Sequence, residues 1–178
     1  MNATGARALP SRTTQREAEL RLRGGLLQRF LNGELRSVAL LYLPYHLYDV
    51  TIRRAGATRR ARYAGDALCG ALDPYEFDSL PDASVPAEGR NVLPVMLSPE
   101  AGAERLRDQL RRMIYRQGFF RAGKLEIAVQ PAGEMILVPH WAGFYGRGQE
   151  ARLRVLDGVR GTLEGAKARE MVLEWLMA

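Results

Sequence analysis

Residues 41–46, LYLPYH, carry the pattern that decides the fold, because a similar run, MILVPHW, stands at residues 135–141. In each run, aliphatic side chains typical of a β-strand lead to a proline that is followed by aromatic or imidazole rings. A second pattern follows each run, since residues 66–73, DALCGALD, match residues 157–164, DGVRGTLE. Similarity of this kind within one chain indicates an internal repeat.

A helix is predicted before each strand run. Apolar side chains recur there every four residues, at Leu22, Leu26 and Phe30 in the first copy and at Leu106, Leu110 and Ile114 in the second. This spacing places them on one face of a helix. The second helix starts with Ser98 as its N-cap and Pro99 in its first turn. The first helix is expected to be weaker, because Gly24 and Gly25 interrupt it.

Antiparallel strands are predicted after each helix. The first copy has strand patterns over residues 36–50 and 51–64, with a turn near Ala55 and Gly56. The second copy has strand patterns over residues 124–130, 134–145 and 151–156, with turns at residues 131–133 and 146–148. A last helix is expected over about residues 165–177, where apolar side chains again gather on one side.

These patterns predict an α+β protein made of two helix-plus-antiparallel-sheet repeats and a C-terminal helix. The predicted parts are a disordered tail over 1–15, a first repeat over 16–73, a Pro-rich acidic linker over 74–97, a second repeat over 98–164 and the C-terminal helix over 165–178. Because independent units of roughly 70 residues are marginally stable, we expect the repeats to share one core or one sheet.

The second copy, over residues 98–164, resembles a PepSY-type repeat. In that family a helix that opens with a small polar residue and a glutamate leads to antiparallel strands and an Asp-x-x-x-Gly turn. Ser98 and Glu100 open the helix here, and Asp157 and Gly161 stand at the turn. A degenerate copy over 16–73 matches more loosely. The resemblance implies a non-catalytic binding or regulatory module and transfers no catalytic residue.

The two Asp-to-Gly segments are interpreted as structural turns, independently of any family. Asp66 and Asp157 are expected to accept hydrogen bonds from backbone N–H groups a few residues on. Gly70 and Gly161 are expected to supply a positive φ, which other residues adopt at a cost. Calcium or anion binding at these turns is the alternative interpretation.

The composition bounds the class of protein. The chain is 47% hydrophobic and 26% charged, which excludes a wholly disordered chain. Cys69 is the single cysteine, so no intramolecular disulfide forms, and a reducing compartment fits this usage. No secretory signal pattern is visible and the longest apolar run is too short to span a bilayer. We therefore expect a cytoplasmic location.

No catalytic constellation is supported by the sequence, so the protein is expected not to be an enzyme. Residues 118–124 match G-x-x-x-x-G-K, but Leu125 stands where a nucleotide-binding loop requires Ser or Thr. His46 and His140 are the only histidines, and with Cys69 and a carboxylate they are metal ligands in principle. Because no ligand spacing supports such a site, neither a metal nor a cofactor is expected.

A protein or peptide partner is the leading prediction, and its contact surface is expected on the two Pro-aromatic strands. The candidate residues for that contact are Tyr45, His46, Tyr48, His140, Trp141 and Tyr145. Aromatic rings on strands line grooves for extended peptides or stacked bases. Packing of the same rings in the core is the alternative.

A nucleic-acid partner is the alternative function, because the chain carries 26 Lys and Arg against 20 Asp and Glu and a net charge of +6. The candidate anion-binding residues are Arg53, Arg54, Arg59, Arg60, Arg62, Arg152 and Arg154. By strand alternation, Arg60 and Arg62 share one face, where arginines neutralise phosphates. An anionic membrane surface is a further candidate partner, and a solvated strand edge is the structural alternative.

Overall fold

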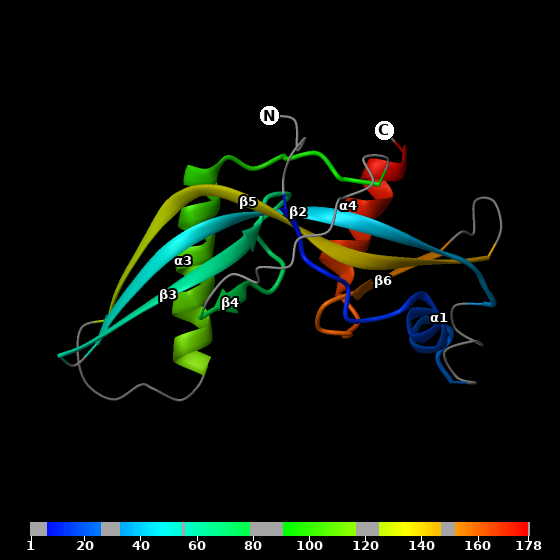
Figure 1. The fold of residues 1–178 in the computed structure, drawn as a ribbon, viewed down its shortest axis with the longest axis horizontal. Coiled ribbons are helices and arrows are strands. Elements are labelled where there is room, and N and C mark those ends of the chain that lie inside the picture. Colours follow the sequence, from blue (N-terminus) through cyan, green and yellow to red (C-terminus); the bar gives the residue numbers. More distant parts are fainter. Residues whose placement is uncertain are drawn as a thin grey trace. The chain divides into compact units, whose positions relative to one another are not determined.

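A computed structural model describes residues 7–25, 33–54, 56–78, 91–116, 125–146 and 152–177, and its α+β fold confirms the predicted class. The described helices are α1 (Gln15–Arg23), α3 (Pro99–Arg116) and α4 (Ala166–Met177). The strands are β1 (Arg7–Ala8), β2 (Leu35–Arg54), β3 (Ala57–Asp66), β4 (Tyr75–Phe77), β5 (Glu126–Tyr145) and β6 (Arg152–Asp157) (Figure 1). They form one sheet in the order β1-β5-β2-β3-β4, with β6 beside β5.

The chain divides into two compact units, and neither unit is one continuous segment. Unit 1 consists of residues 1–3, 44–82 and 94–136, and unit 2 consists of residues 4–43, 83–93 and 137–178. The long strands β2 and β5 each pass from one unit into the other. The units therefore differ from the predicted consecutive repeats over 16–73 and 98–164, because each unit takes its helices and strands from both halves of the chain.

Unit 1 places α3 against the strands β2, β3 and β5 (Figure 1). Its core contains Tyr48 and Val50 of β2, Tyr63 of β3 and Leu106 and Leu110 of α3, all at most 4% exposed. Leu106 and Leu110 belong to the predicted apolar helix face, and alternate residues of β2 supply the matching sheet face. The helix packs on the sheet because each buries the apolar face of the other.

Two helices of unit 2, α1 and α4, pack against β6. The side chains of Ala18 and Leu22 on α1 pack with Trp141 of β5 and Leu156 of β6. Helix α4 also packs against β6. Its buried residues include Val172, on the side that the sequence predicted to be apolar. Among the described residues, no helix is both long and apolar enough to cross a bilayer.

The start of helix α3 lies where the sequence predicts it. Helix α3 follows Ser98, whose Oγ accepts a hydrogen bond of 3.2 Å from the N–H of Ala101. Helix α1 follows Thr14 and ends at Gly24, which has φ 60°. The predicted apolar stripe of this helix continues to Leu26 and Phe30, which lie outside the described residues.

Two strand predictions are corrected by the structure. The strand β2 runs unbroken from Leu35 to Arg54, so no break occurs between residues 50 and 51. The pairing of Arg54 with Ala57 agrees with the chain reversal predicted there. The strand β5 is also 20 residues long and contains residues 131–133, where a turn was predicted. Gly133 has φ 75° there. A glycine in this conformation is typical of a local irregularity that bends a strand without reversing it.

The predicted tail and linker also contain ordered structure. Within the tail, β1 belongs to the sheet, and the N–H of Leu9 donates a 2.8 Å hydrogen bond to the carbonyl of Leu137. Within the linker, β4 pairs with β3, and Tyr75 is buried. Neither segment has a strong sequence pattern for a strand. Each is ordered because its backbone pairs with a strand of the sheet. The predicted linker residues 79–90 lie outside the described part of the chain.

Candidate functional site

The carboxylate of Asp66 organises the turn that follows β3. Its Oδ1 accepts hydrogen bonds from the N–H groups of Leu68, Cys69 and Gly70 at 2.8 to 3.2 Å, and its Oδ2 accepts one from Leu72 at 2.8 Å. Gly70 has φ 62°. Arg105 of α3 donates a hydrogen bond to the carbonyl of Cys69. Asp66 and Gly70 thus form a structural turn to which the helix α3 is attached.

The turn after β6 is built in a similar way in unit 2. Asp157 Oδ1 accepts hydrogen bonds of 2.8 Å from the N–H groups of Val159 and Arg160, and Gly161 has φ 69°. Arg21 of α1 donates a hydrogen bond to the carbonyl of Gly161. The helix α1 is therefore attached to this turn as α3 is attached to the turn in unit 1.

The prolines of the two repeated runs have matching backbone contacts. The carbonyl of Pro44 accepts a hydrogen bond from Ala67, and that of Pro139 accepts one from Gly158, at 2.8 and 2.9 Å. Each of these two turn residues then accepts hydrogen bonds at its own carbonyl from the segment that leads into a helix. The donors are Met96 and Leu97 for Ala67, and Arg12 and Thr13 for Gly158.

Unit 2 contains a buried cluster of one imidazole from β5, one carboxylate from the end of β6 and one carboxylate from the segment before α4. The ligand atoms of His140, Asp157 and Glu164 all lie within 4.8 Å of one another. His140 and Asp157 are fully buried. His140 and Asp157 are directly paired across β5 and β6, which places their side chains on one face. In the described residues, this is the group whose chemistry suits a metal ion.

The sequence reasoning did not find this cluster, although it named all three residues. The sequence groups His140 with His46 and Cys69 as possible metal ligands. Glu164 is only the last residue of the repeated segment 157–164. The missing information was the strand register, which places His140 opposite Asp157. His46 and Cys69 belong to unit 1 and His140 to unit 2.

The six predicted partner-binding residues are buried. Their exposed fractions range from zero to 8%, for Tyr45, His46, Tyr48, His140, Trp141 and Tyr145. His46 Nε2 lies 2.9 Å from the carbonyl of Leu97, and Trp141 Nε1 donates to the carbonyl of Thr13 at 3.1 Å. These rings hold the segments before α3 and α1 to the strands, so in this structure they do not form an exposed contact surface.

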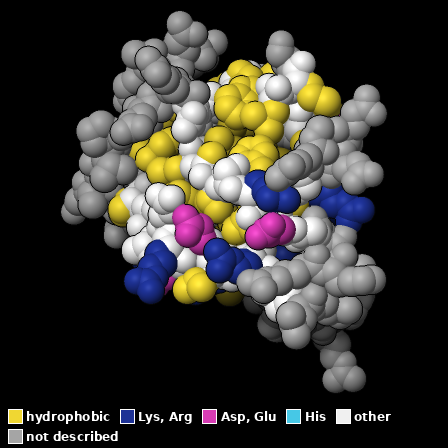
Figure 2. All heavy atoms as spheres, turned by 90° about the vertical axis from the view of Figure 1, so that its right-hand side faces the viewer, with side chains coloured by type: hydrophobic (Ala, Val, Ile, Leu, Met, Phe, Trp, Pro, Cys, Tyr) yellow, Lys and Arg dark blue, Asp and Glu magenta, His cyan; other side chains and the backbone are white. Residues whose placement is uncertain are grey.

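The histidines are also absent from the face drawn in Figure 2. That face gathers hydrophobic side chains, with charged side chains of both signs near its margin (Figure 2). Large exposed hydrophobic residues of unit 2 include Leu20 of α1 and Leu176 and Met177 of α4. Both histidines are buried in the interior.

The predicted anion-binding arginines lie on different faces. In the register of β2 and β3, Arg60 is opposite Thr51 and Arg62 is opposite Asp49, so both share a face with Arg53. This face points away from the side chains that α3 covers. Arg59 is opposite Ile52 on the α3 side, where it pairs with Glu76, and Arg54 lies on that side too.

The remaining two arginines belong to unit 2. Arg152 and Arg154 are opposite Tyr145 and Gly143, on the face that α1 covers. They alternate around the buried Leu153, as the sequence predicted. No single surface therefore unites all seven arginines.

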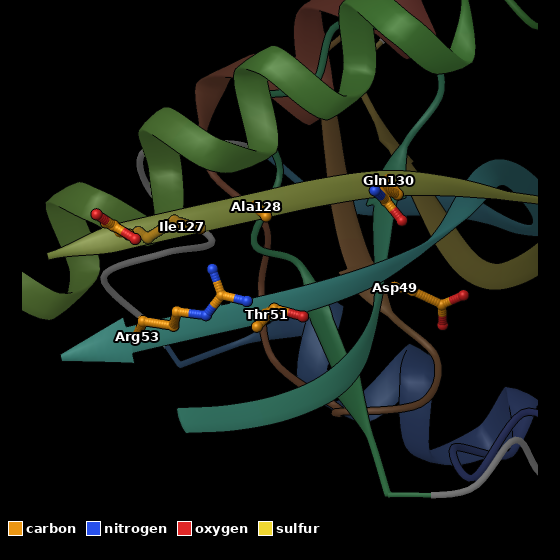
Figure 3. Close-up of a pocket in the computed structure, with 7 residues that line it drawn as sticks. Asp49, Thr51, Arg53, Ile127, Ala128 and Gln130 are labelled. Carbon is orange, nitrogen blue, oxygen red and sulfur yellow. The ribbon is translucent and has the colours of Figure 1, made fainter. Parts of the chain in front are cut away.

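The face of unit 1 that carries Arg53 is hollowed into a shallow groove of about 270 Å³. Its lining residues are Asp49, Thr51, Arg53, Glu126, Ile127, Ala128 and Gln130. Figure 3 shows Arg53 lying along β2 toward Thr51, with Gln130 extending from β5. Asp49 is joined to Arg62, whose Nε lies 3.1 Å from Asp49 Oδ1. We name this groove, together with Arg60 and Arg62, the open face.

Burial and neighbouring carboxylates change the acidity of three side chains in unit 1. Burial raises the pKa of Tyr48, and Asp66 and Glu100 raise it further. Burial also raises the pKa of Tyr63, whose hydroxyl donates a 2.7 Å hydrogen bond to Glu76. Burial and Asp66 raise the pKa of the Cys69 thiol. A thiol of raised pKa is a poor nucleophile near neutral pH, which argues against catalysis by Cys69.

Comparison of the chain with protein-family models, with curated proteins and with solved structures finds no match. The resemblance to a PepSY-type repeat therefore stays a prediction.

Proposed function

We propose that the protein is a non-enzymatic binding module that recognises an acidic segment of a protein partner on the open face of unit 1. The observation that carries the proposal is the groove itself, because it offers exposed Arg53 beside the hydrogen-bonding side chains of Thr51 and Gln130. Arg60 is exposed opposite Thr51. Arginine binds carboxylates through paired hydrogen bonds, so two neighbouring arginines suit an acidic peptide.

The charges of the open face favour a protein over a nucleic acid. Asp49 and Glu126 line the same groove, and Asp49 is paired with Arg62. These carboxylates repel the unbroken series of phosphates in a nucleic acid, whereas an acidic peptide can place one of its polar or basic side chains beside them and its carboxylates beside Arg53 and Arg60. Phe77 of β4 stands opposite Arg62, and its ring stacks on that of Tyr75, so one of its two faces is not available to a base.

We also infer that the two units are copies of one repeat with exchanged helices. The support is the correspondence of contacts in the two units, in which a turn aspartate, a helix arginine and a strand proline make similar hydrogen bonds. Helix α1 lies before the first strand run but packs on β6, and α3 lies before the second run but packs on β3. The lone cysteine supports a reducing, cytoplasmic setting for this module.

The test measures binding of fluorescent acidic, basic and neutral peptides and of a single-stranded oligonucleotide to the full chain. We expect the acidic peptide to bind and the double variant Arg53→Ala/Arg60→Ala to weaken it by at least tenfold. The control is Arg111→Ala/Arg112→Ala, which removes the same charge from an exposed part of α3. Equal losses of affinity in both variants would show that the net charge of the protein, and not the open face, causes the binding.

Binding of the oligonucleotide with a steep salt dependence, and no binding of the acidic peptide, would favour the nucleic-acid alternative instead. Turnover of a small molecule without peptide binding would contradict the non-enzymatic assignment.

A further inference from the structure

We propose that His140, Asp157 and Glu164 bind a divalent transition-metal ion, with Zn²⁺ the closest fit to their donor atoms. The three ligand atoms converge within 4.8 Å of one another, and His140 Nε2 lies 4.0 Å from Glu164 Oε1. Zinc bonds to imidazole nitrogen and carboxylate oxygen are about 2.0–2.2 Å long, so donors to one ion lie roughly 3–3.5 Å apart. His140 Nε2 and Glu164 Oε1, at 4.0 Å, must therefore approach each other by roughly 0.5–1 Å to share one ion.

The imidazole of His140 is oriented as a ligand. Its Nδ1 lies 3.1 Å from the carbonyl of Val138, which only accepts, so the ring donates its Nδ1–H there. In the neutral ring, Nε2 then carries the lone pair that faces Glu164. A hydrogen bond from the second ring nitrogen to a backbone carbonyl is the usual way in which proteins orient metal-binding histidines.

The carboxylate of Asp157 is oriented as well. Val159 and Arg160 donate backbone hydrogen bonds to Oδ1, which fixes the plane of the carboxylate. Arg160 also approaches Oδ2, with its Nη1 at 3.7 Å. The side chain of Glu164 is 12% exposed, so the cluster has a route to solvent. A divalent cation balances the charges of the two carboxylates in this buried place.

The corresponding turn of unit 1 lacks these features. Tyr45 stands opposite Asp66, where His140 stands opposite Asp157. Asp66 receives backbone hydrogen bonds on both oxygens. In the repeated pattern, Asp73 occupies the place of Glu164, and it is exposed. Two turns of similar backbone therefore differ at the side chains that a metal requires, which sets the His140 cluster apart from a merely structural turn.

The test uses the full chain, freed of metal with a chelator, and titrates it with zinc chloride in a calorimeter. We expect saturable binding of one ion, weakened at least tenfold by Glu164→Gln. Asp73→Asn is the matched control and should bind zinc as the unmodified chain does. Magnesium chloride should bind far more weakly, because Mg²⁺ prefers an all-oxygen site.

A second measurement needs no variant, because the chain has only two histidines. In nitrogen NMR of the imidazoles, zinc should shift Nε2 of His140 and leave His46 unchanged. The proposal is overturned if zinc shows no saturable binding, if Glu164→Gln keeps the original affinity, or if His46 responds in place of His140. If acid shifts the His140 resonances but zinc does not, the cluster binds a proton and no metal, and the proposal is wrong. Each of these results leaves peptide binding at the open face untouched.

Discussion

Tyr48 and Gly102 show how closely α3 approaches the sheet in unit 1. A Cβ at Gly102 would overlap the Tyr48 hydroxyl and lie 3.3 Å from Cζ of the same ring. Among the described residues, no hydrogen-bond partner reaches that hydroxyl. The ring is fully buried, so it has little room to move away. The approach of helix and strand therefore depends on the absence of a side chain at position 102.

This contact gives a prediction for two single variants and their combination. Gly102→Ala should destabilise the protein by about 1–3 kcal/mol through overpacking, in spite of a gain of about 1 kcal/mol in helix propensity. Tyr48→Phe removes a buried hydroxyl and should leave stability unchanged or raise it by about 1 kcal/mol. In the double variant the loss should be largely reversed. Urea unfolding of all four proteins measures the coupling, and additive changes would contradict the proposed contact.

Cys69 is predicted to react slowly with thiol reagents. Burial and Asp66 raise its pKa, so less thiolate is present at a given pH than in an ordinary cysteine. The rate of labelling with a disulfide reagent should be several-fold below that of the urea-unfolded chain at pH 8. The rate should go on rising above pH 9. A rate that levels off below the ordinary thiol pKa would show an activated cysteine instead.

At the scale of elements, α1 is a short helix whose stability depends on its capping residues. The helix has nine residues and is closed at its start by Thr14 and Glu17. Thr14 Oγ1 accepts from the N–H of Glu17 at 3.3 Å, and Glu17 Oε2 accepts from the N–H of Thr14 at 2.8 Å. Helices this short are marginal without caps and tertiary packing. The contact of Leu22 with Trp141 supplies the packing.

Thr14→Ala is predicted to cost about 1 kcal/mol of stability near neutral pH. The hydrogen bond from Thr14 lowers the pKa of Glu17. A carboxylate with a lowered pKa stabilises the fold above its ordinary pKa and loses that effect as the pH falls through the lowered one. The cost of the substitution should therefore be smaller at acid pH. Thermal unfolding at both pH values, with the exposed Thr162→Ala as control, checks this expectation.

At the scale of the whole molecule, each unit depends on both halves of the chain. Helix α1 from the first half packs on Trp141 and Leu156 from the second. Helix α3 from the second half packs on Tyr48 and Tyr63 from the first. Neither half therefore contains all the residues of either core. This arrangement explains why consecutive repeats, which the sequence suggested, are not the compact units.

Separate expression of residues 1–90 and 91–178 provides the corresponding prediction. Each fragment alone should lack a cooperative unfolding transition, because it holds only part of the sheet on which its helix packs. The two fragments together should form a folded complex. Circular dichroism and gel filtration measure both outcomes. A fragment that unfolds cooperatively by itself would contradict the exchange of helices between the halves.

The sequence by itself determined the α+β class, the start of α3 at Ser98 and the reversal of the chain between β2 and β3. These features follow from local chemistry: periodic apolar side chains, capping hydroxyls and glycines with positive φ. The sequence also marked Asp66 and Asp157 as turn residues, since a carboxylate that accepts nearby N–H groups acts within its own segment.

Only the tertiary structure decided which faces meet. An apolar stripe shows that a helix must be covered, but it does not show which strands cover it. Strand register, which no local pattern fixes here, places His140 opposite Asp157 and Arg60 opposite Thr51. The buried metal-type cluster and the open face are made by these long-range pairings, because side chains far apart in the chain become neighbours only when the sheet forms.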